Sequence, residues 1–343
     1  MLAGMNDAAK RRVRGWLAAW LVCALATLPA GAASPGEVDP QAPLTFGILP
    51  IGGPAESLEA WRPMLDDLHK TLDRPIRAVS VTTYEGIAQA ISEQRVDIAF
   101  LSGRLALDAV TRENMQVIGQ LTRGDGSRGY YAVLVVASDS RLRTLDQLFA
   151  HPGKWRFARG EALSVSGYLV PETQLFAARG VDSDTFFANV HVDNHQNNAL
   201  AVANGEADVA TNNTADMERF KQHFPEQFAR LRILWKSSLI PHAVIVIRND
   251  LPSSLRAQVA AFITGYGKGK DGAREAANLK LIHDISGFAP AGNADLVPFA
   301  DIEYALEQRR ATSAQWVSDG AREARFRKIR HDHDGLVAHL RGK

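Results

Sequence analysis

The stretch LTFGILPIGG, residues 44–53, sets the architecture of the chain. Its first six residues form a short, mostly apolar run that ends at a proline and two glycines, which is typical of a buried β-strand. Trp61, Leu65, Leu68 and Leu72 follow at the three- and four-residue spacing of one helix face. The sequence therefore predicts a strand followed directly by a helix, the first half of a βαβ unit.

The same alternation continues along the chain. Strands are predicted at 76–81, 96–100 and 129–137, and helical spacing appears between them at 84–91 and 105–110. Strands that alternate with helices are typical of parallel sheets, because parallel neighbours need a crossover connection. We therefore expect an α/β protein with a largely parallel sheet.

The second half of the chain repeats this rhythm, with clear helix ends. Thr144 is a predicted N-cap, the predicted helix at 169–179 ends at Gly180, and the one at 197–204 ends at Gly205. Apolar strands lie between and after these helices. A second α/β unit is therefore predicted.

The two units are expected to form two lobes joined by strands near residues 135–140 and 238–246. Strands at both crossovers favour a hinge over a loose linker, and a hinged cleft between lobes is a preferred site for ligands. The predicted boundaries are 44–136 plus 245–300 for lobe 1, 137–244 for lobe 2, and 301–343 for a C-terminal helical tail.

Composition excludes several classes of protein. The 343 residues are 46% hydrophobic and 22% charged, an ordinary globular mixture with room for about two domains. The formal net charge is only +1, whereas nucleic-acid-binding proteins usually carry a basic excess, so no nucleic-acid partner is expected. The single cysteine, Cys23, permits neither a disulfide framework nor a cysteine-rich zinc site.

Residues 1–33 have the three parts of a secretory signal peptide. A basic cluster at 10–14 precedes an apolar run of 13 residues at 16–28, and small residues follow that run. A membrane-spanning helix needs about 20 residues, although an uncleaved anchor stays open as an alternative. Cleavage near Ala32 or Ala33 removes four basic residues and one acidic residue, which leaves 35 basic and 37 acidic ones. The sequence therefore predicts export to the periplasm.

The sharpest candidate for a binding site is Ser164-Val165-Ser166-Gly167, directly before a predicted helix. The first backbone N–H groups of a helix lack carbonyl partners and carry partial positive charge, so they attract anions. Serine hydroxyls add donors, and glycine lets an oxyanion approach the backbone. A plain serine cap without a ligand is the alternative interpretation.

Four further side chains are candidates for the same site. His195 precedes a predicted helix, whereas Tyr84 and Tyr130 open a helix and a strand. Arg104 follows a predicted strand, at the edge where α/β sheets bind ligands. The alternatives are a structural histidine, two packing aromatics and a surface arginine.

Enzyme signatures are scarce in this chain. The patterns G-x-S-x-G, H-E-x-x-H and G-x-x-x-x-G-K-[ST] are all missing from the sequence. His331-Asp332-His333-Asp334 offers metal ligands, but a solvated charged helix is the favoured interpretation. We expect no catalysis, no cofactor and no bound metal.

Five strings of the sequence, taken in order, resemble the periplasmic substrate-binding proteins of phosphate/phosphite/phosphonate ABC transporters. The strings are GYYAVLVV (129–136), SVSGYLVP (164–171), NALAVANG (198–205), DVATNNT (208–214) and LWKSSLIP (234–241). The resemblance covers about residues 44–300 and implies the two-lobed, type II periplasmic binding protein fold with a hinged cleft. It also implies capture of a phosphonate-like oxyanion and its delivery to an ABC transporter permease in the inner membrane.

The resemblance implies roles for single residues. The family's serine-rich helix start, which holds the phosphonate oxygens, matches residues 164–167. Its cleft tyrosines match Tyr84 and Tyr130, and its anion-contacting histidine matches His195. The family usually has threonine in place of Val165, so one hydroxyl is lost here while the backbone N–H remains.

The chain departs from the family where the tail of the ligand would lie. Members that bind aminoalkylphosphonates carry carboxylates at the positions of Ala215 and Ala243, where they pair with the ligand amine. Asp216 is one position away on a predicted helix, so we expect it to point elsewhere, and Arg104 replaces an uncharged residue. An unpaired ammonium in a closed cleft costs several kcal/mol. We therefore expect a second acidic group or a neutral tail rather than aminoethylphosphonate.

Other functions stay open at this point. The same fold could serve as a ligand-sensing module for a membrane signalling receptor. The oxyanion could instead be phosphite, a phosphate ester or a sulfonate. A secreted enzyme is the third alternative, although the sequence shows no nucleophile–base pair.

Overall fold

The computed structural model describes residues 42–49, 51, 53–127, 129–282 and 284–342. The chain divides into two units, Met1–Glu37 and Val38–Lys343, and all elements described below belong to the second unit. The predicted signal peptide lies outside the described residues. Within the described ranges, no helix combines the length and the apolar character that a membrane span requires.

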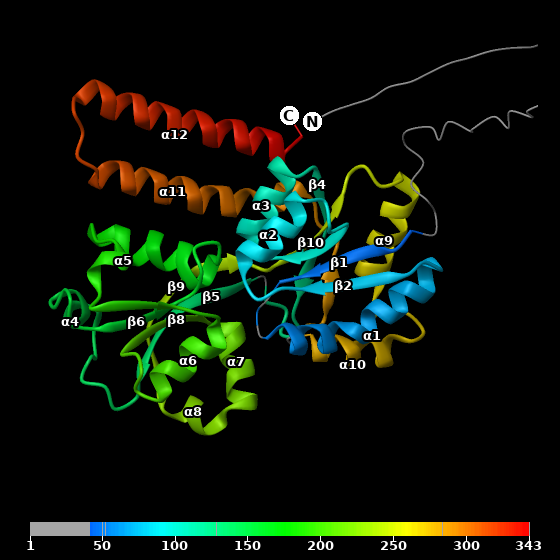
Figure 1. The fold of residues 1–343 in the computed structure, drawn as a ribbon, viewed down its shortest axis with the longest axis horizontal. Coiled ribbons are helices and arrows are strands. Elements are labelled where there is room, and N and C mark those ends of the chain that lie inside the picture. The colour runs from blue at the N-terminus through cyan, green and yellow to red at the C-terminus, as the bar shows by residue number, and fades with distance from the viewer. Residues whose placement is uncertain (1–41, 50, 52, 128, 283, 343) are drawn as a thin grey trace, which may run out of the picture. The chain divides into compact units, whose positions relative to one another are not determined.

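The first lobe is built on a mixed sheet (Figure 1). Its strands are β1 (Leu44–Ile48), β2 (Ile76–Ser80), β3 (Ile98–Leu101), β4 (Met115–Thr122), β10 (Val244–Arg248) and β11 (Gly287–Ala289). They lie in the order β11-β4-β10-β3-β1-β2. β1 pairs in parallel with β2 and β3, whereas β10 is antiparallel to β3 and β4.

Helices cover both faces of this sheet. They are α1 (Pro54–Leu72), α2 (Tyr84–Ser92), α3 (Gly103–Arg112), α9 (Ser253–Gly265) and α10 (Gly272–Leu281). α2 and α3 lie on one side of the sheet, and α1 and α10 lie on the other (Figure 1). Trp61 of α1 is fully buried, and its ring centroid lies 5.1 Å from those of Phe46 and Phe100. The opening strand and helix predicted from residues 44–72 therefore form the centre of the first core.

The second lobe holds a smaller mixed sheet. Its strands are β5 (Gly129–Ala137), β6 (Arg156–Arg159), β7 (Asn189–Val192), β8 (Val209–Asn213) and β9 (Leu231–Pro241), in the order β7-β6-β8-β5-β9. Its helices are α4 (Leu145–Phe149), α5 (Ser183–Phe186), α6 (His195–Ala203), α7 (Thr214–His223) and α8 (Pro225–Ala229). Thr144 caps α4 in a capping box, as its sequence predicts. Phe157, Phe176 and Phe187 pack ring against ring in the core of this lobe.

The two sheets share one plan, which explains how the chain crosses between lobes. In the first sheet, β10 lies between β3 and β4 and is antiparallel to both. In the second sheet, β5 lies between β8 and β9 and is again antiparallel to both. Each is the strand that has just arrived from the other lobe. Because both are hydrogen-bonded along two edges, they fix the ends of the short connections at 123–128 and 242–243.

Two expectations about this architecture need correction. Both sheets are mixed rather than largely parallel, because each contains the crossover strand that runs against its neighbours. Residues 129–136 belong to the second lobe, so the first connection lies at 123–128 and not near 135–140. The apolar β-branched pattern of 129–137 predicts a buried strand but does not indicate which sheet receives it.

The helix predicted at 169–179 begins earlier and is not α-helical. Two π-helical turns, η1 (Val165–Leu169) and η2 (Glu172–Phe176), precede the 3₁₀ turn η3 (Ala177–Arg179). Gly180 ends the segment at φ +70°, the left-handed C-terminal position that favours glycine, as predicted. π-helical turns are rare and occur frequently at functional sites.

The C-terminal residues form a helical hairpin that contacts both lobes (Figure 1). It consists of α11 (Val297–Ser313) and α12 (Asp319–Leu340). Arg310 of α11 donates a hydrogen bond to the Tyr168 hydroxyl of the second lobe at 3.2 Å. In the first lobe, the Phe299 ring packs so closely on Gly103 that a Cβ there would come within 2.2 Å of it. The tail therefore bridges the lobes on one side.

Candidate ligand-binding site

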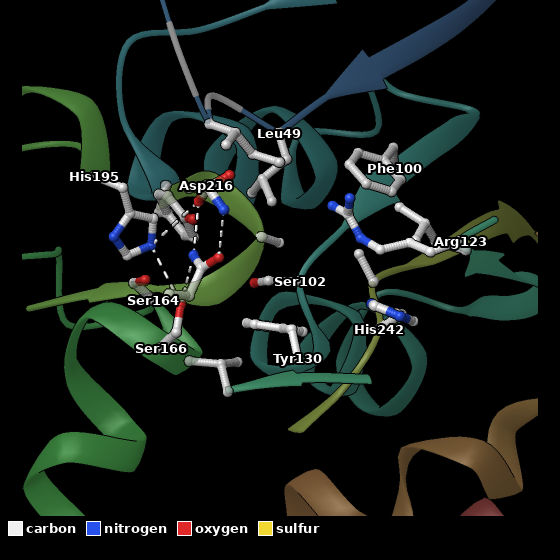
Figure 2. A pocket seen from close by; sticks show the side chains of 17 residues that line it. Leu49, Phe100, Ser102, Arg123, Tyr130, Ser164, Ser166, His195, Asp216 and His242 are labelled. Atoms are coloured by element: carbon white, nitrogen blue, oxygen red, sulfur yellow. Dashed lines mark hydrogen bonds and ion pairs between the residues drawn. The ribbon is translucent and has the colours of Figure 1, made fainter. Parts of the chain in front are cut away.

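A pocket lies between the lobes, at the ends of several strands (Figure 2). Residues that follow β1 and β3 line it from the first lobe, and residues that follow β6 and β8 line it from the second. The carboxyl ends of strands are the usual ligand edge of an α/β sheet. The cavity volume is about 70 Å³, and one water molecule needs roughly 10–15 Å³. The pocket therefore suits a compound of few heavy atoms.

Ser166, His195, Asn213 and Asp216 form one hydrogen-bonded cluster on the second-lobe side, and Figure 2 shows three of them, Ser166, His195 and Asp216, close together. The Nδ2 atom of Asn213 donates to Ser166 Oγ at 3.2 Å and to Asp216 Oδ2 at 2.7 Å. Ser166 Oγ also lies 3.2 Å from His195 Nε2. Ser166, His195 and Asn213 are buried. Because these groups hydrogen-bond to one another, the cluster is organised in the protein itself.

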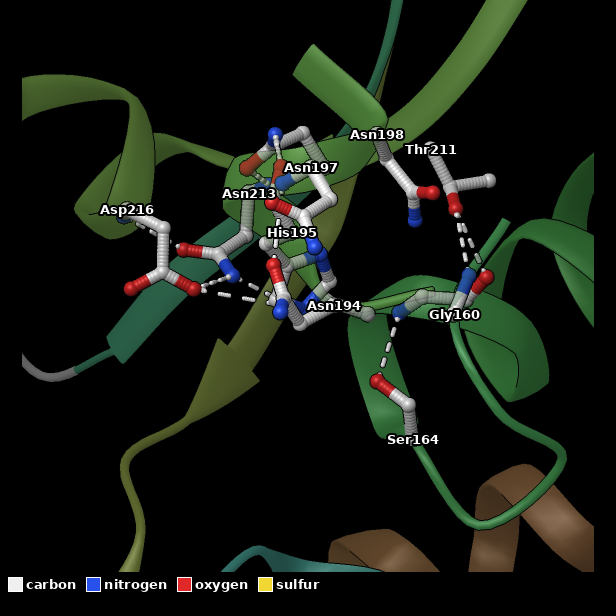
Figure 3. Close-up of polar contacts among 12 residues, drawn as sticks. Gly160, Ser164, Asn194, His195, Asn197, Asn198, Thr211, Asn213 and Asp216 are labelled. Atoms are coloured by element: carbon white, nitrogen blue, oxygen red, sulfur yellow. Dashed lines mark hydrogen bonds and ion pairs between the residues drawn. The ribbon is translucent and has the colours of Figure 1, made fainter. Parts of the chain in front are cut away.

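Small residues position the start of the first π-helical turn. Ser164 is its N-cap, with Oγ accepting the backbone N–H of Gly167 at 3.1 Å. A Cβ on Gly167 would lie 2.7 Å from that oxygen and 2.8 Å from Gly160 Cα, so a larger residue would displace the backbone. Thr211 Oγ1 ties the turn to β8: it donates to the Gly167 carbonyl and accepts the Gly160 N–H (Figure 3). Gly167 therefore shapes the turn and is not among the residues that line the pocket.

The structure brings most of the predicted site residues together. The lining residues among them are Tyr84, Tyr130, Ser164, Val165, Ser166 and His195. Tyr84 reaches Ser164 across the cleft, and Tyr130 faces Ser166. Burial raises the pKa of both phenols well above the usual value, so both hydroxyls stay protonated at neutral pH.

Burial also sets the charge of His195. Desolvation lowers its pKa, although Asp216 Oδ2, 3.9 Å from Nε2, acts in the opposite direction. The imidazole is therefore neutral at pH 7, and its role as donor or acceptor follows its tautomer. The second-lobe side consequently offers neutral hydrogen-bonding groups, with one carboxylate beside them.

The Ser166–His195–Asp216 arrangement is not a catalytic triad. In a triad, the carboxylate binds the ring nitrogen opposite the one that faces the nucleophile. Here the hydroxyl and the carboxylate both face Nε2, and His195 Nδ1 is buried without a hydrogen-bond partner among the described residues. In the same part of the chain, no group of three or more His, Cys, Asp or Glu side chains is placed to hold a metal. The geometry favours binding over catalysis.

The first-lobe side of the pocket is different. Leu49, Phe100 and Leu121 give it apolar surface, and its polar groups include Ser102 and Arg123. Ser102 begins α3 without a side-chain cap bond, and its Oγ is buried without a partner among the described residues. The Nε atom of Arg123 is likewise buried and unpartnered within those residues.

The structure corrects the prediction for Arg104. Its guanidinium is held outside the pocket by Asp108 at 3.0 Å and by Glu303 of α11 at 2.6 Å. Residue 104 lies in the first turn of α3, and its side chain turns towards the C-terminal tail rather than the strand edge. The cation that lines the pocket is Arg123.

Several residues that line the pocket were not predicted from the sequence. Arg123 lies in the Gly-containing connection after β4, and His242 follows Pro241 in the second connection. Their positions at the two crossovers between the lobes are the sequence feature that could have identified them as lining residues. Asp216 was expected to point away but lines the pocket. The reason is local: Asn213 caps α7 by accepting the backbone N–H of Asp216 at 2.8 Å, and its amide holds the Asp216 carboxylate.

Two polar contacts join the lobes beside the pocket. The carboxylate of Glu161, in the segment after β6, accepts the backbone N–H of Tyr84 at 2.9 and 3.1 Å. Burial raises the pKa of Glu161, although the backbone N–H groups at the start of α2 favour its ionised form. Arg219 of α7 forms an ion pair with Glu56 of α1. Glu161 therefore caps a helix of one lobe with a side chain of the other.

Comparison with protein families places this geometry among known proteins. The family described as "ABC transporter, phosphonate, periplasmic substrate-binding protein" matches residues 46–296. The phosphonates-binding periplasmic protein of Escherichia coli K12 is 34% identical over 307 residues, which is 88% of each chain. The phosphate-import protein PhnD of Mycolicibacterium smegmatis is 22% identical over 61% of this chain and 67% of its own.

Solved structures extend this likeness to three dimensions. The binding protein component of an ABC phosphonate transporter from Pseudomonas aeruginosa is 29% identical, with a TM-score of 0.80 over 86% of this chain and 97% of its own. PhnD1 from Prochlorococcus marinus, solved in complex with methylphosphonate, is 19% identical with a TM-score of 0.67 over 78% and 99%. At that identity, the second structure supports the fold alone.

Proposed function

The chain belongs to the periplasmic substrate-binding proteins of phosphonate ABC transporters, and from this premise we propose that its interlobe pocket captures a small phosphonate. Members of this family bind substrate and carry out no reaction on it. In the proposal, residues 1–33 direct export to the periplasm. The loaded protein then delivers its ligand to the permease in the inner membrane.

One observation carries the choice of an oxyanion as ligand. Hydroxyl side chains of both lobes and the His195 imidazole of the second lobe line one small pocket. We assign the phosphonate oxygens to Ser164, Ser166, His195 and the two tyrosines, with Val165 contributing its backbone N–H. Fixed neutral donors at this end of the pocket bind a tetrahedral oxyanion through charge-assisted hydrogen bonds.

Isothermal titration calorimetry tests this proposal directly. The full chain is titrated with methylphosphonate, phosphate and sulfate, together with its Ser166→Ala variant. We expect methylphosphonate to bind and sulfate not to bind. The substitution removes a donor and leaves Asn213 and His195 short of a partner, so affinity should fall at least tenfold.

The matched control is Ser253→Ala, which removes an exposed serine at the start of α9, outside the pocket. Its affinity should equal that of the unsubstituted chain. A chain that is folded, as judged by circular dichroism, and binds none of the phosphonates would overturn the proposal.

A further inference from the structure

Arg123 is the one cation that lines the pocket among the described residues, and it forms no ion pair with any of them. No Asp or Glu carboxylate within the described ranges lies within 4.0 Å of its guanidinium nitrogens, and its Nε is buried without a partner. The nearest acid along the chain is Asp125, whose exposed carboxylate accepts the Ser127 N–H; Arg123 contributes to its lowered pKa only from a distance, without an ion pair. A buried donor left unpaired is costly, so this group requires a partner that the protein does not supply.

The surroundings of Arg123 make that cost larger. Phe100, Leu121 and Ala243 line the same pocket with apolar surface. His242 lies on the same side (Figure 2), and burial together with the charge of Arg123 lowers its pKa to about 4. It is therefore neutral at pH 7 and adds no second cation. An isolated guanidinium in such surroundings favours an anionic partner.

A second unpartnered donor belongs to the same wall. Ser102 Oγ is buried where β3 ends and α3 begins, and it lines the pocket. A guanidinium and a hydroxyl together match the two oxygens of a carboxylate, for which arginine is the preferred partner.

The pocket's own carboxylate is engaged on the other side. Asp216 lies beside His195 (Figure 2), accepts the Asn213 amide at 2.7 Å and lies 3.9 Å from His195 Nε2. Ala215 and Ala243 line the pocket without any charge. The end of the pocket that carries Arg123 is therefore positive, and the end that carries Ser166 is organised for an oxyanion.

We propose that the natural ligand carries two anions, a phosphonate at the Ser164–Ser166 end and a carboxylate on a short chain that pairs with Arg123 and Ser102. This inference rests on the proposed function, since it assigns the tail of the same ligand. A cavity of about 70 Å³ limits the chain to a few atoms. The substrate class is thus the short phosphonocarboxylates, such as phosphonoacetate and 3-phosphonopropionate.

Calorimetry of the full chain with four ligands separates the inference from the proposed function. The ligands are methylphosphonate, phosphonoacetate, 3-phosphonopropionate and 2-aminoethylphosphonate. We expect at least one phosphonocarboxylate to bind tenfold or more tightly than methylphosphonate. Arg123→Gln should reduce that ratio to about one, and Arg123→Lys, which keeps the charge but loses the planar fork, should leave an intermediate ratio.

Arg77→Gln is the matched control, because Arg77 is an exposed arginine on β2. In this variant the ratio of phosphonocarboxylate affinity to methylphosphonate affinity should not change. Three outcomes overturn the two-anion inference: equal affinity for methylphosphonate and both phosphonocarboxylates, tighter binding of aminoethylphosphonate, or an Arg123→Gln variant that weakens all ligands by one factor. Methylphosphonate binding in those cases keeps the proposed function. Failure of all four ligands to bind would overturn both.

Discussion

The two sides of the pocket differ in where their polar groups find partners. On the second-lobe side, Ser166, His195, Asn213 and Asp216 bond to one another. On the first-lobe side, Ser102 Oγ and Arg123 Nε are buried without partners in the described part of the chain. One side is thus organised by the protein, whereas the other is completed by what enters the cleft. Organised groups lower the entropic cost of binding, and unpartnered groups make binding selective.

The largest expected effect comes from breaking the organised side at Asn213. Its amide donates to Ser166 and Asp216, and its oxygen caps α7. Asn213→Ala should weaken methylphosphonate binding by about 2–3 kcal/mol, roughly 30–150-fold, since it leaves buried groups unsatisfied. Loss of the cap should lower the free energy of unfolding by about 1 kcal/mol. Calorimetry and urea unfolding measure the two effects separately.

Ser318→Ala is the control for the loss of a cap. Ser318 Oγ accepts the Ala321 N–H at the start of α12, far from the lining residues. This variant should lose a similar amount of stability and keep its affinity. Normal binding by a folded Asn213→Ala variant would contradict the idea of an organised second-lobe side.

The next effect concerns the contact that holds the two sides together. Glu161→Gln keeps an acceptor for the Tyr84 N–H but removes its charge. Charge-assisted hydrogen bonds contribute roughly twice as much as neutral ones, so we expect a loss of about 1.4 kcal/mol, a tenfold increase in the ligand dissociation rate. Stopped-flow measurements give that rate.

Glu206→Gln, an exposed glutamate of the second lobe, should leave the rate unchanged. A Glu161→Gln variant that releases ligand at the original rate would mean that the lobes hold together without this carboxylate. The comparison between the two sides would then stand, but without a role for Glu161 in closure.

An effect spread over several pH units tests the first-lobe side. The pKa of His242 is lowered from 6.5 to about 4, chiefly by burial and next by the charge of Arg123, with Asp125 and Ser127 opposing them. A histidine with a lowered pKa binds its proton more readily in the unfolded chain. Its contribution to stability is therefore full above pH 6.5 and is lost as the pH falls towards 4, at up to about 1 kcal/mol per pH unit.

His242→Gln should remove this part of the pH dependence. The readout is the difference between the free energies of unfolding of the two chains across pH 4–7. The difference is needed because Glu303, with its pKa raised to about 7 by burial, titrates in the same window with the opposite sign. A difference that does not change with pH would show that His242 is not held neutral on the first-lobe side.

The sequence predicted the organised side better than the unpartnered one, for a physical reason. Serines and glycine at a helix start, and a histidine before another helix, are local patterns, and the three residues they single out, Ser164, Ser166 and His195, line one pocket. The lobes follow from the alternation of strands and helices. Which sheet receives residues 129–137 depends on pairing between distant segments, which periodicity does not encode.

Arg123 and Arg104 show that side-chain positions, too, depend on contacts between distant segments that the local sequence does not encode. Both follow strands of the first sheet, and both are candidates by position along the chain. Glu303, about 200 residues from Arg104 along the chain, makes the difference between them. Its carboxylate pairs with Arg104 and holds that side chain against the C-terminal tail. No comparable acid within the described residues reaches Arg123, so it remains in the pocket.

The smallest expected effect is that of Arg104→Gln, and it sharpens the comparison because Arg104 is the matched cation outside the pocket. Its partners Asp108 and Glu303 lie 3.0 and 2.6 Å away. The affinities for methylphosphonate and for the phosphonocarboxylates should stay within twofold of the original values in calorimetry. Stability should change little at neutral pH, because the buried Glu303 carboxyl can take up a proton when its cation is removed. A clear loss of phosphonocarboxylate affinity alone would mean that the positive end of the ligand site extends from Arg123 through α3 to the C-terminal tail.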